Sequence, residues 1–114
     1  MWGHVVLSVG SDRALLRLRD EVLRAAGYVV REHVPAQLTS FEHDFEVVIL
    51  CHSIPSEQRR RIIEFIRSQK PNAPILLVRA DGENSEMVDA TVHGLDGPQT
   101  LLDCIGKLLH KAAS

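Results

Sequence analysis

Three short apolar runs constrain the fold of this chain more than any other feature. They cover residues 5–9, broken only by Ser8, residues 47–50 and residues 75–78. A strand that is apolar along its whole length belongs in a parallel sheet whose two faces are both covered by helices. The three runs therefore predict an α/β fold.

Segments of helical periodicity separate these runs. Helices are expected at residues 13–26, 35–43, 55–69 and 98–111. Strands are expected at residues 5–9, 28–33, 45–50, 75–78 and 87–92. Such alternation with right-handed crossovers gives a three-layer, doubly wound parallel sheet of order 2-1-3-4-5. The segment 81–85 between the last two strands is short, so we expect a shortened or absent fourth helix.

The helix expected at residues 13–26 is well marked at both ends and along one face. Its apolar face is predicted from residues that recur at helical spacing, namely Leu15, Leu18, Val22, Leu23 and Ala26. Ser11 or Asp12 can cap its start, and Gly27 suits a left-handed conformation at its end.

Length and charge limit the classes of function. The 114 residues, 45% hydrophobic and 25% charged, suit one domain over residues 1–114. A net charge of -2 provides no positive field for nucleic acid. The basic run Arg59–Arg61, with Arg67 further on, has no interleaved aromatic residues, so we interpret it as a solvated helix face.

Cysteine usage and hydropathy predict the compartment. Cys51 and Cys104 lie in segments of different type, and no stretch near the amino terminus has the pattern of a signal peptide. No apolar run approaches the roughly 20 residues that a membrane helix requires. We expect a cytoplasmic protein that does not span a membrane, with Cys104 as a buried, inert thiol on the last helix.

The carboxyl ends of the first, third and fourth strands define the expected site. In open α/β sheets ligands bind at this edge, near the point where the strand order reverses. The residues expected there are Gly10, Ser11, Asp12, Cys51, His52 and Arg79.

The order of these motifs resembles the receiver domain of two-component response regulators, which has a flavodoxin-like fold. The similarity is carried by residues 5–9, by residues 25–28 at the end of the first helix, and by residues 44–55 with Pro55 after the third strand. Residues 74–80 and 98–109 extend it over nearly the whole chain. The resemblance implies a role in signal transduction.

The same resemblance shows where this chain departs from the family. Gly10 and Ser11 stand where receivers carry an acidic pair that holds Mg²⁺, with only Asp12 following. Cys51 stands at the phosphoacceptor position, and a thiol is a soft ligand that Mg²⁺ does not favour. Arg79 occupies the switch position, and Gly94-Leu95 replaces the lysine after the fifth strand. Loss of acceptor, metal site and cation together removes the phosphoryl-transfer mechanism, so we expect a degenerate pseudo-receiver.

The expected function is a signalling or scaffold module that does not depend on phosphorylation, is not an enzyme and needs no cofactor. It would bind a protein partner through the last helix, the fifth strand and the loop around Gly82, and homodimerisation through that face is an option. One alternative is a redox sensor or small enzyme that acts through Cys51. Another is an atypical response regulator in a phosphorelay, phosphorylated on an unexpected residue.

Two site hypotheses remain beside these. Arg79, His52 and the backbone near Ser53 could hold an anion or a partner carboxylate, although an ion pair from Arg79 to Asp12 or Asp81 is the simpler expectation. Cys51, His52 and His93, with Asp12 or Asp81, could approach one another at the same edge as zinc ligands. The spacing matches no metal motif, so no metal is expected.

Overall fold

The computed structural model describes residues 4–33, 45–51, 54–79, 88–93 and 96–113. The strands are β1 (Val5–Val9), β2 (Val29–His33), β3 (Val47–Leu50), β4 (Ile75–Arg79) and β5 (Ala90–His93). The helices are α1 (Arg13–Ala25), α2 (Ser56–Gln69) and α3 (Pro98–Ala113). The helix expected at residues 35–43 and the segment of the shortened crossover lie outside the described residues.

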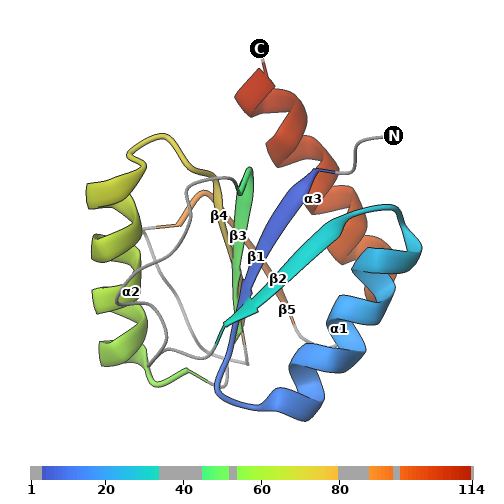
Figure 1. Cartoon of the computed structure of the whole chain (residues 1–114), viewed down its shortest axis with the longest axis horizontal. Helices are drawn as coiled ribbons and strands as arrows, with labels where there is room; N and C mark the ends of the chain where they lie inside the picture. The colour runs from blue at the N-terminus through green and yellow to red at the C-terminus, as the bar shows by residue number, and fades with distance from the viewer. Residues whose placement is uncertain (1–3, 34–44, 52–53, 80–87, 94–95, 114) are drawn as a thin grey trace.

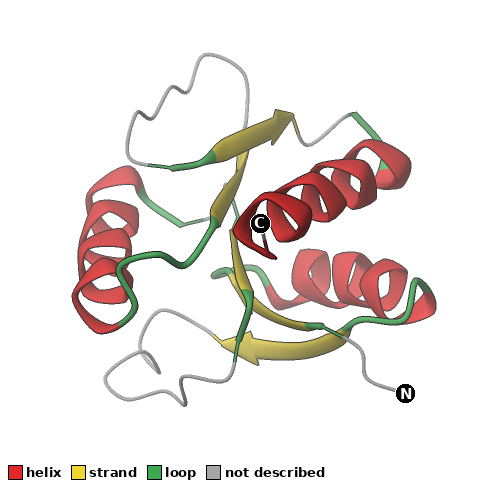
Figure 2. Ribbon diagram, turned by 90° about the horizontal axis from the view of Figure 1, so that it is seen from above, coloured by secondary structure: helices red, strands yellow, loops and turns green. Residues whose placement is uncertain are grey.

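The five strands form one parallel sheet in the predicted order β2-β1-β3-β4-β5 (Figure 1). Helices α1 and α3 cover one face and α2 covers the other, which Figure 2 shows from above. The expectation of an α/β fold with three layers is therefore confirmed.

Each face of the sheet buries its own apolar cluster because side chains alternate along a strand. In β3, Val48 and Leu50 pack with α2, whereas Val47 and Ile49 pack on the side of α1 and α3. All four β3 residues are fully buried. The unbroken apolar run at 47–50 thus belongs to the central strand, as predicted.

Helix α1 begins and ends as the sequence indicates. The Asp12 carboxylate accepts hydrogen bonds from the N–H groups of Ala14 (3.0 Å) and Leu15 (3.2 Å), which makes Asp12 the N-cap. Gly27 follows the helix with φ +98°, the left-handed conformation that glycine adopts most readily.

The apolar face predicted for α1 is wrong in part. Leu18 is 65% exposed, and the buried residues of α1 are Leu16, Asp20 and Leu23. These three lie four and three residues apart, so they share one face of the helix. A carboxylate therefore lies in the middle of the buried face.

The fifth strand begins later than predicted, at Ala90 instead of Met87. Asp89 precedes it, and its carboxylate accepts hydrogen bonds from the Ile75 N–H (2.8 Å) and from Arg67 Nη2 (3.0 Å). The Asp89 N–H in turn donates to the Ile75 carbonyl (2.9 Å). This bonding holds Asp89 in a bend at the sheet edge, and regular pairing starts only after it.

Candidate functional site

The candidate site lies where β1 and β3 end, and its central feature is the close approach of Gly10 to Cys51. A Cβ atom added to Gly10 would lie 2.9 Å from the Cys51 Cβ and 3.0 Å from a methyl group of Leu16. Real Cβ atoms do not approach side chains this closely, so the backbone at position 10 requires glycine. The structure thus brings Gly10 and Cys51 together as expected.

Cys51 is held in place by the backbone on both sides. Its N–H donates to the Val9 carbonyl (2.9 Å), and its carbonyl accepts from the Ile54 N–H (3.2 Å). Cys51 is fully buried and is not in a disulfide. A buried thiol in apolar surroundings is inert toward oxidants and electrophiles, because burial disfavours the thiolate and keeps reagents in the solvent away from the sulfur.

Ser11 and Asp12 are exposed and form the turn into α1. The Asp12 carboxylate is engaged with the first turn of the helix, as described above. Arg79 is half-buried at the end of β4, where its position pairs with His93 of β5. His52 and Ser53, which completed the expected anion pocket, lie outside the described residues, as does Asp81.

The described residues at this edge do not form a donor set that fits Mg²⁺. This ion prefers an octahedral shell of oxygen ligands with carboxylates among them. Position 10 has no room for a side chain, position 51 carries sulfur, and Asp12 caps a helix. Within the described ranges, no three His, Cys, Asp or Glu side chains gather where they could hold a metal ion. The zinc hypothesis around Cys51 and His93 gains no support from these residues either.

The basic run on α2 is only partly a solvated face. Arg60 and Arg61 are exposed, but Arg59 is 5% exposed and donates from Nη1 to the Ile54 carbonyl (3.3 Å). The expectation is therefore wrong for Arg59. Its guanidinium binds Ile54, and the N–H group of Ile54 in turn donates to the Cys51 carbonyl.

The buried carboxylate of Asp20 was not predicted from the sequence. Asp20 is fully buried, with Ser8 of β1 and Glu32 of β2 as its polar neighbours. Burial, followed by the neighbouring Glu32 carboxyl, raises the pKa of Asp20 to about 7. Its position between Leu16 and Leu23 was the available signal, because an acidic residue in the packed line of a helix is unusual.

Cys104 on α3 is partly buried instead of fully buried. Burial raises the pKa of its thiol, and nearby Lys107 acts in the opposite direction. A raised pKa lowers the thiolate fraction, which fits the expected lack of reactivity.

Comparison with solved structures relates this geometry to known proteins. The chain is similar to a CheY-like response regulator receiver domain protein from Methanospirillum hungatei, with a TM-score of 0.83, 20% identity and 98% of each chain covered. It is also similar to the response regulator TrrA from Thermotoga maritima, solved in complex with Mg(2+)-BeF, with a TM-score of 0.81, 23% identity, and 93% of this chain and 99% of that chain covered.

A third similar structure is the receiver domain of the sensor histidine kinase PA1611 from Pseudomonas aeruginosa, which has a magnesium ion coordinated in the active site cleft. Its TM-score is 0.82 at 14% identity, with 96% of this chain and 99% of that chain covered. No family model and no curated protein matches the sequence. The chain therefore has the receiver fold, as the motifs indicated. None of the helices in the described part is long and apolar enough to cross a membrane.

Proposed function

We propose that this chain is a cytoplasmic signalling or scaffold module that uses the receiver fold without aspartyl phosphorylation, performs no catalysis and acts by binding a protein partner. The observation that carries this proposal is the contact between Gly10 and Cys51. Phosphoryl transfer of the receiver type needs a metal that bridges oxygens and a carboxylate acceptor. Position 10 has no room for a carboxylate and position 51 carries a thiol, so these two positions provide neither a metal ligand of this kind nor the acceptor.

The chemical test is treatment of the purified chain with acetyl phosphate and Mg²⁺, followed by intact mass measurement. We expect no added phosphate, whereas a receiver with an intact acidic pair and aspartate acceptor, treated in parallel, gains one. A stable adduct on this chain, located by peptide mapping, would overturn the proposal in favour of an atypical phosphorylatable regulator.

The partner surface is proposed to include α3 and β5. Gly106 of α3 is exposed, and a side chain added there meets nothing within 4 Å, so it can carry a photo-reactive residue without disturbing the fold. Arg60, exposed on α2 across the sheet, is the matched control position. We expect crosslinks in the native cell from position 106 and not from position 60. Crosslinks from position 60 alone would place the partner on the α2 side of the sheet and contradict the proposed surface.

The thiol alternative through Cys51 is disfavoured by the complete burial of this residue. With Cys104→Ser in place, Cys51 is the single remaining cysteine. We expect its reaction with a thiol reagent to be limited by opening of the protein, and so to become independent of reagent concentration. Rapid reaction that rises in proportion to reagent concentration would favour the redox sensor instead.

A further inference from the structure

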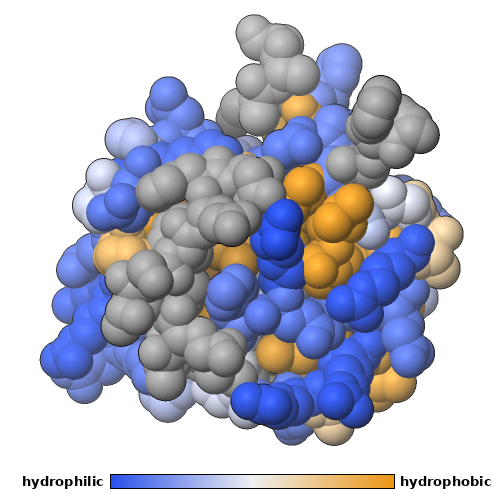
Figure 3. Space-filling view, viewed as in Figure 1, coloured by the Kyte–Doolittle hydropathy of each residue, from blue (hydrophilic) through white to orange (hydrophobic). Residues whose placement is uncertain are grey.

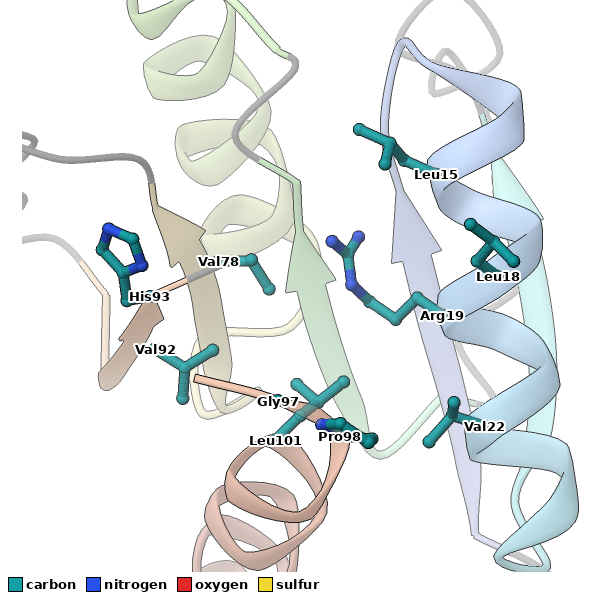
Figure 4. A pocket seen from close by; sticks show the side chains of 10 residues that line it. All are labelled: Leu15, Leu18, Arg19, Val22, Val78, Val92, His93, Gly97, Pro98 and Leu101. Atoms are coloured by element: carbon teal, nitrogen blue, oxygen red, sulfur yellow. The ribbon is translucent and has the colours of Figure 1, made fainter. Parts of the chain in front are cut away.

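A cavity of about 260 Å³ lies on the face of the sheet that α1 and α3 cover. Its walls come from four elements: Leu15 and Val22 of α1, Val78 of β4, Val92 of β5 and Leu101 of α3. Figure 4 shows these side chains around a common space between the two helices. The cavity belongs to this helical face and is lined by neither Gly10 nor Cys51.

One cation reaches into this apolar space. The Arg19 guanidinium extends from α1 toward Val78 (Figure 4). Its Nη1 atom is buried and has no hydrogen-bond partner within the part of the chain that the structure describes. A buried N–H without a partner is unfavourable, and a guanidinium forms its strongest hydrogen bonds with carboxylates. An anionic group bound in the cavity next to Arg19 would provide the hydrogen-bond partner that Nη1 lacks among the described residues.

The remaining surface of the cavity specifies the rest of the ligand. Aliphatic side chains and Pro98 form most of the walls, His93 of β5 is a further polar lining residue, and Leu18 is 65% exposed. An apolar cavity of about 150 Å³ in another protein takes up benzene. A volume of about 260 Å³ thus has room for one ring and a short arm that bears a carboxylate.

We propose that this cavity is a binding site for a small aromatic monocarboxylate, with the ring between α1 and α3 and the carboxylate paired with Arg19. The mode is that of an ordinary small-molecule site, in which apolar walls provide affinity and a few polar groups set orientation. Because α1, β4, β5 and α3 all contribute, a bound ligand would join both helices of this face. The proposal does not depend on whether Cys51 can be phosphorylated.

The test on the unmodified chain uses 3-phenylpropionate as the probe and follows backbone amide chemical shifts. We expect saturable changes that concentrate at Arg19, Val22, Val78, Val92 and Leu101. The uncharged 3-phenylpropanol has the same ring and should bind about tenfold more weakly, since it cannot form the charged pair with Arg19. Acetate, which has the carboxylate alone, should produce no saturable change. Equal binding of the acid and the alcohol would overturn the proposal, as would changes centred elsewhere.

Matched variants assign the discrimination to one side chain. Arg19→Gln should bring the acid and the alcohol to within about twofold of each other, whereas Arg17→Gln, on the exposed side of the same helix, should leave the tenfold difference unchanged. Arg19→Lys keeps the charge without the planar fork and should give an intermediate ratio. A ratio unaffected by Arg19→Gln would refute the assignment. Self-association of the ligand-free chain through α1 and α3 that 3-phenylpropionate does not reverse would also refute it, because a second copy would then cover the cavity.

Discussion

Gly10 lies so close to Cys51 and Leu16 that the carboxyl end of β1 has no room for a side chain at position 10. A side chain of any kind at this position meets atoms at 3.0 Å or less. Since protein interiors are close-packed and yield little, the local cost of an added methyl group falls on the backbone of β1 and β3.

We predict opposite effects for two glycine-to-alanine substitutions. Gly10→Ala should lower the free energy of unfolding by about 1–3 kcal/mol through overpacking. Gly106→Ala, in the interior of α3 and in open space, should raise it by about 0.5–1 kcal/mol because alanine favours the helix. Urea unfolding of both variants measures these changes. A neutral Gly10→Ala would show that the site has room for a side chain after all.

Asp20 should make the stability of the protein depend on pH. Its pKa is about 7 in the folded chain against 3.8 in the unfolded chain. Between these values the folded state retains a proton that the unfolded state has lost, so the free energy of unfolding decreases as pH rises and levels off above about 7. Glu32 and Arg24 are the charged groups that act on this carboxyl, and they shift its pKa in opposite directions.

Asp20→Asn should remove most of this slope. The amide has nearly the same shape and no charge to desolvate, so the variant should be more stable than the parent at pH 8 by on the order of 1–3 kcal/mol. Glu21→Gln, the exposed neighbour on α1, should leave the slope unchanged. Urea unfolding between pH 4 and pH 8 provides the comparison. A parent protein whose stability rises over this interval would contradict the assignment.

At the scale of elements, Arg67 and Asp89 join the end of α2 to the starts of β4 and β5. Arg67 Nη1 donates to the carbonyls of Pro71 (3.2 Å) and Ala73 (2.9 Å), and Nη2 donates to Asp89 (3.0 Å). The side chains are only 31% and 40% exposed, so water screens the pair incompletely. A planar guanidinium donates to these three acceptors from two separate nitrogens, whereas an ammonium would have to reach all of them from a single nitrogen.

Arg67→Met should therefore cost about 1–3 kcal/mol of stability, since it leaves carbonyls and the Asp89 carboxylate without their donor. The control is Arg61→Met, which removes an exposed ion pair to Glu57 at 3.6 Å and should cost less than about 0.5 kcal/mol. Thermal unfolding of the two variants under identical conditions measures the difference. Equal effects would mean that the three acceptors at Arg67 contribute nothing beyond a surface charge pair.

At the scale of the whole molecule, stability should be graded from the centre of the sheet outward. Strand β3 is buried on both faces and paired on both sides, while β2 is an edge strand with Val29 46% exposed. Figure 3 shows apolar side chains gathered near the start of β2 among hydrophilic ones. These differences imply that β2 can open without unfolding of the core.

Native-state hydrogen exchange should reveal this gradient. Amides of β3 should exchange only through global unfolding, with a free energy that follows urea as steeply as the equilibrium transition. Amides of β2 should exchange through local opening, with little dependence on urea. Equal protection of the two strands would show that the sheet opens as a single unit.

The fold of this molecule could be predicted from sequence because its signals are local and repeated. The apolar runs of β1, β3 and β4 and the caps of α1 each specify their own element, and parallel topology follows from their order. The start of β5 was placed wrongly, because the bend at Asp89 depends on contacts with Arg67 and Ile75 that lie far away in sequence.

The candidate site was predictable only in its residue types. The sequence indicated Gly10 and Cys51 as neighbours, but the distances that exclude a side chain at position 10, to the Cys51 Cβ and to a Leu16 methyl group, depend on how β1, β3 and α1 pack together. Burial of Asp20 and the cavity beside Arg19 depend on the rotation of α1 about its axis. The apolar pattern placed that rotation incorrectly, since it assigned Leu18 to the packed face.

The crowding at Gly10 also limits the mutational routes open to this sequence. Every residue except glycine at position 51 carries the same Cβ atom, so changing Cys51 to an acid leaves position 10 just as obstructed. A carboxylate introduced first at position 10 would overpack the contact with Cys51 and Leu16 while position 51 still carried a thiol. Placing carboxylates at both positions therefore carries the overpacking cost at position 10 in whichever order the two substitutions are made.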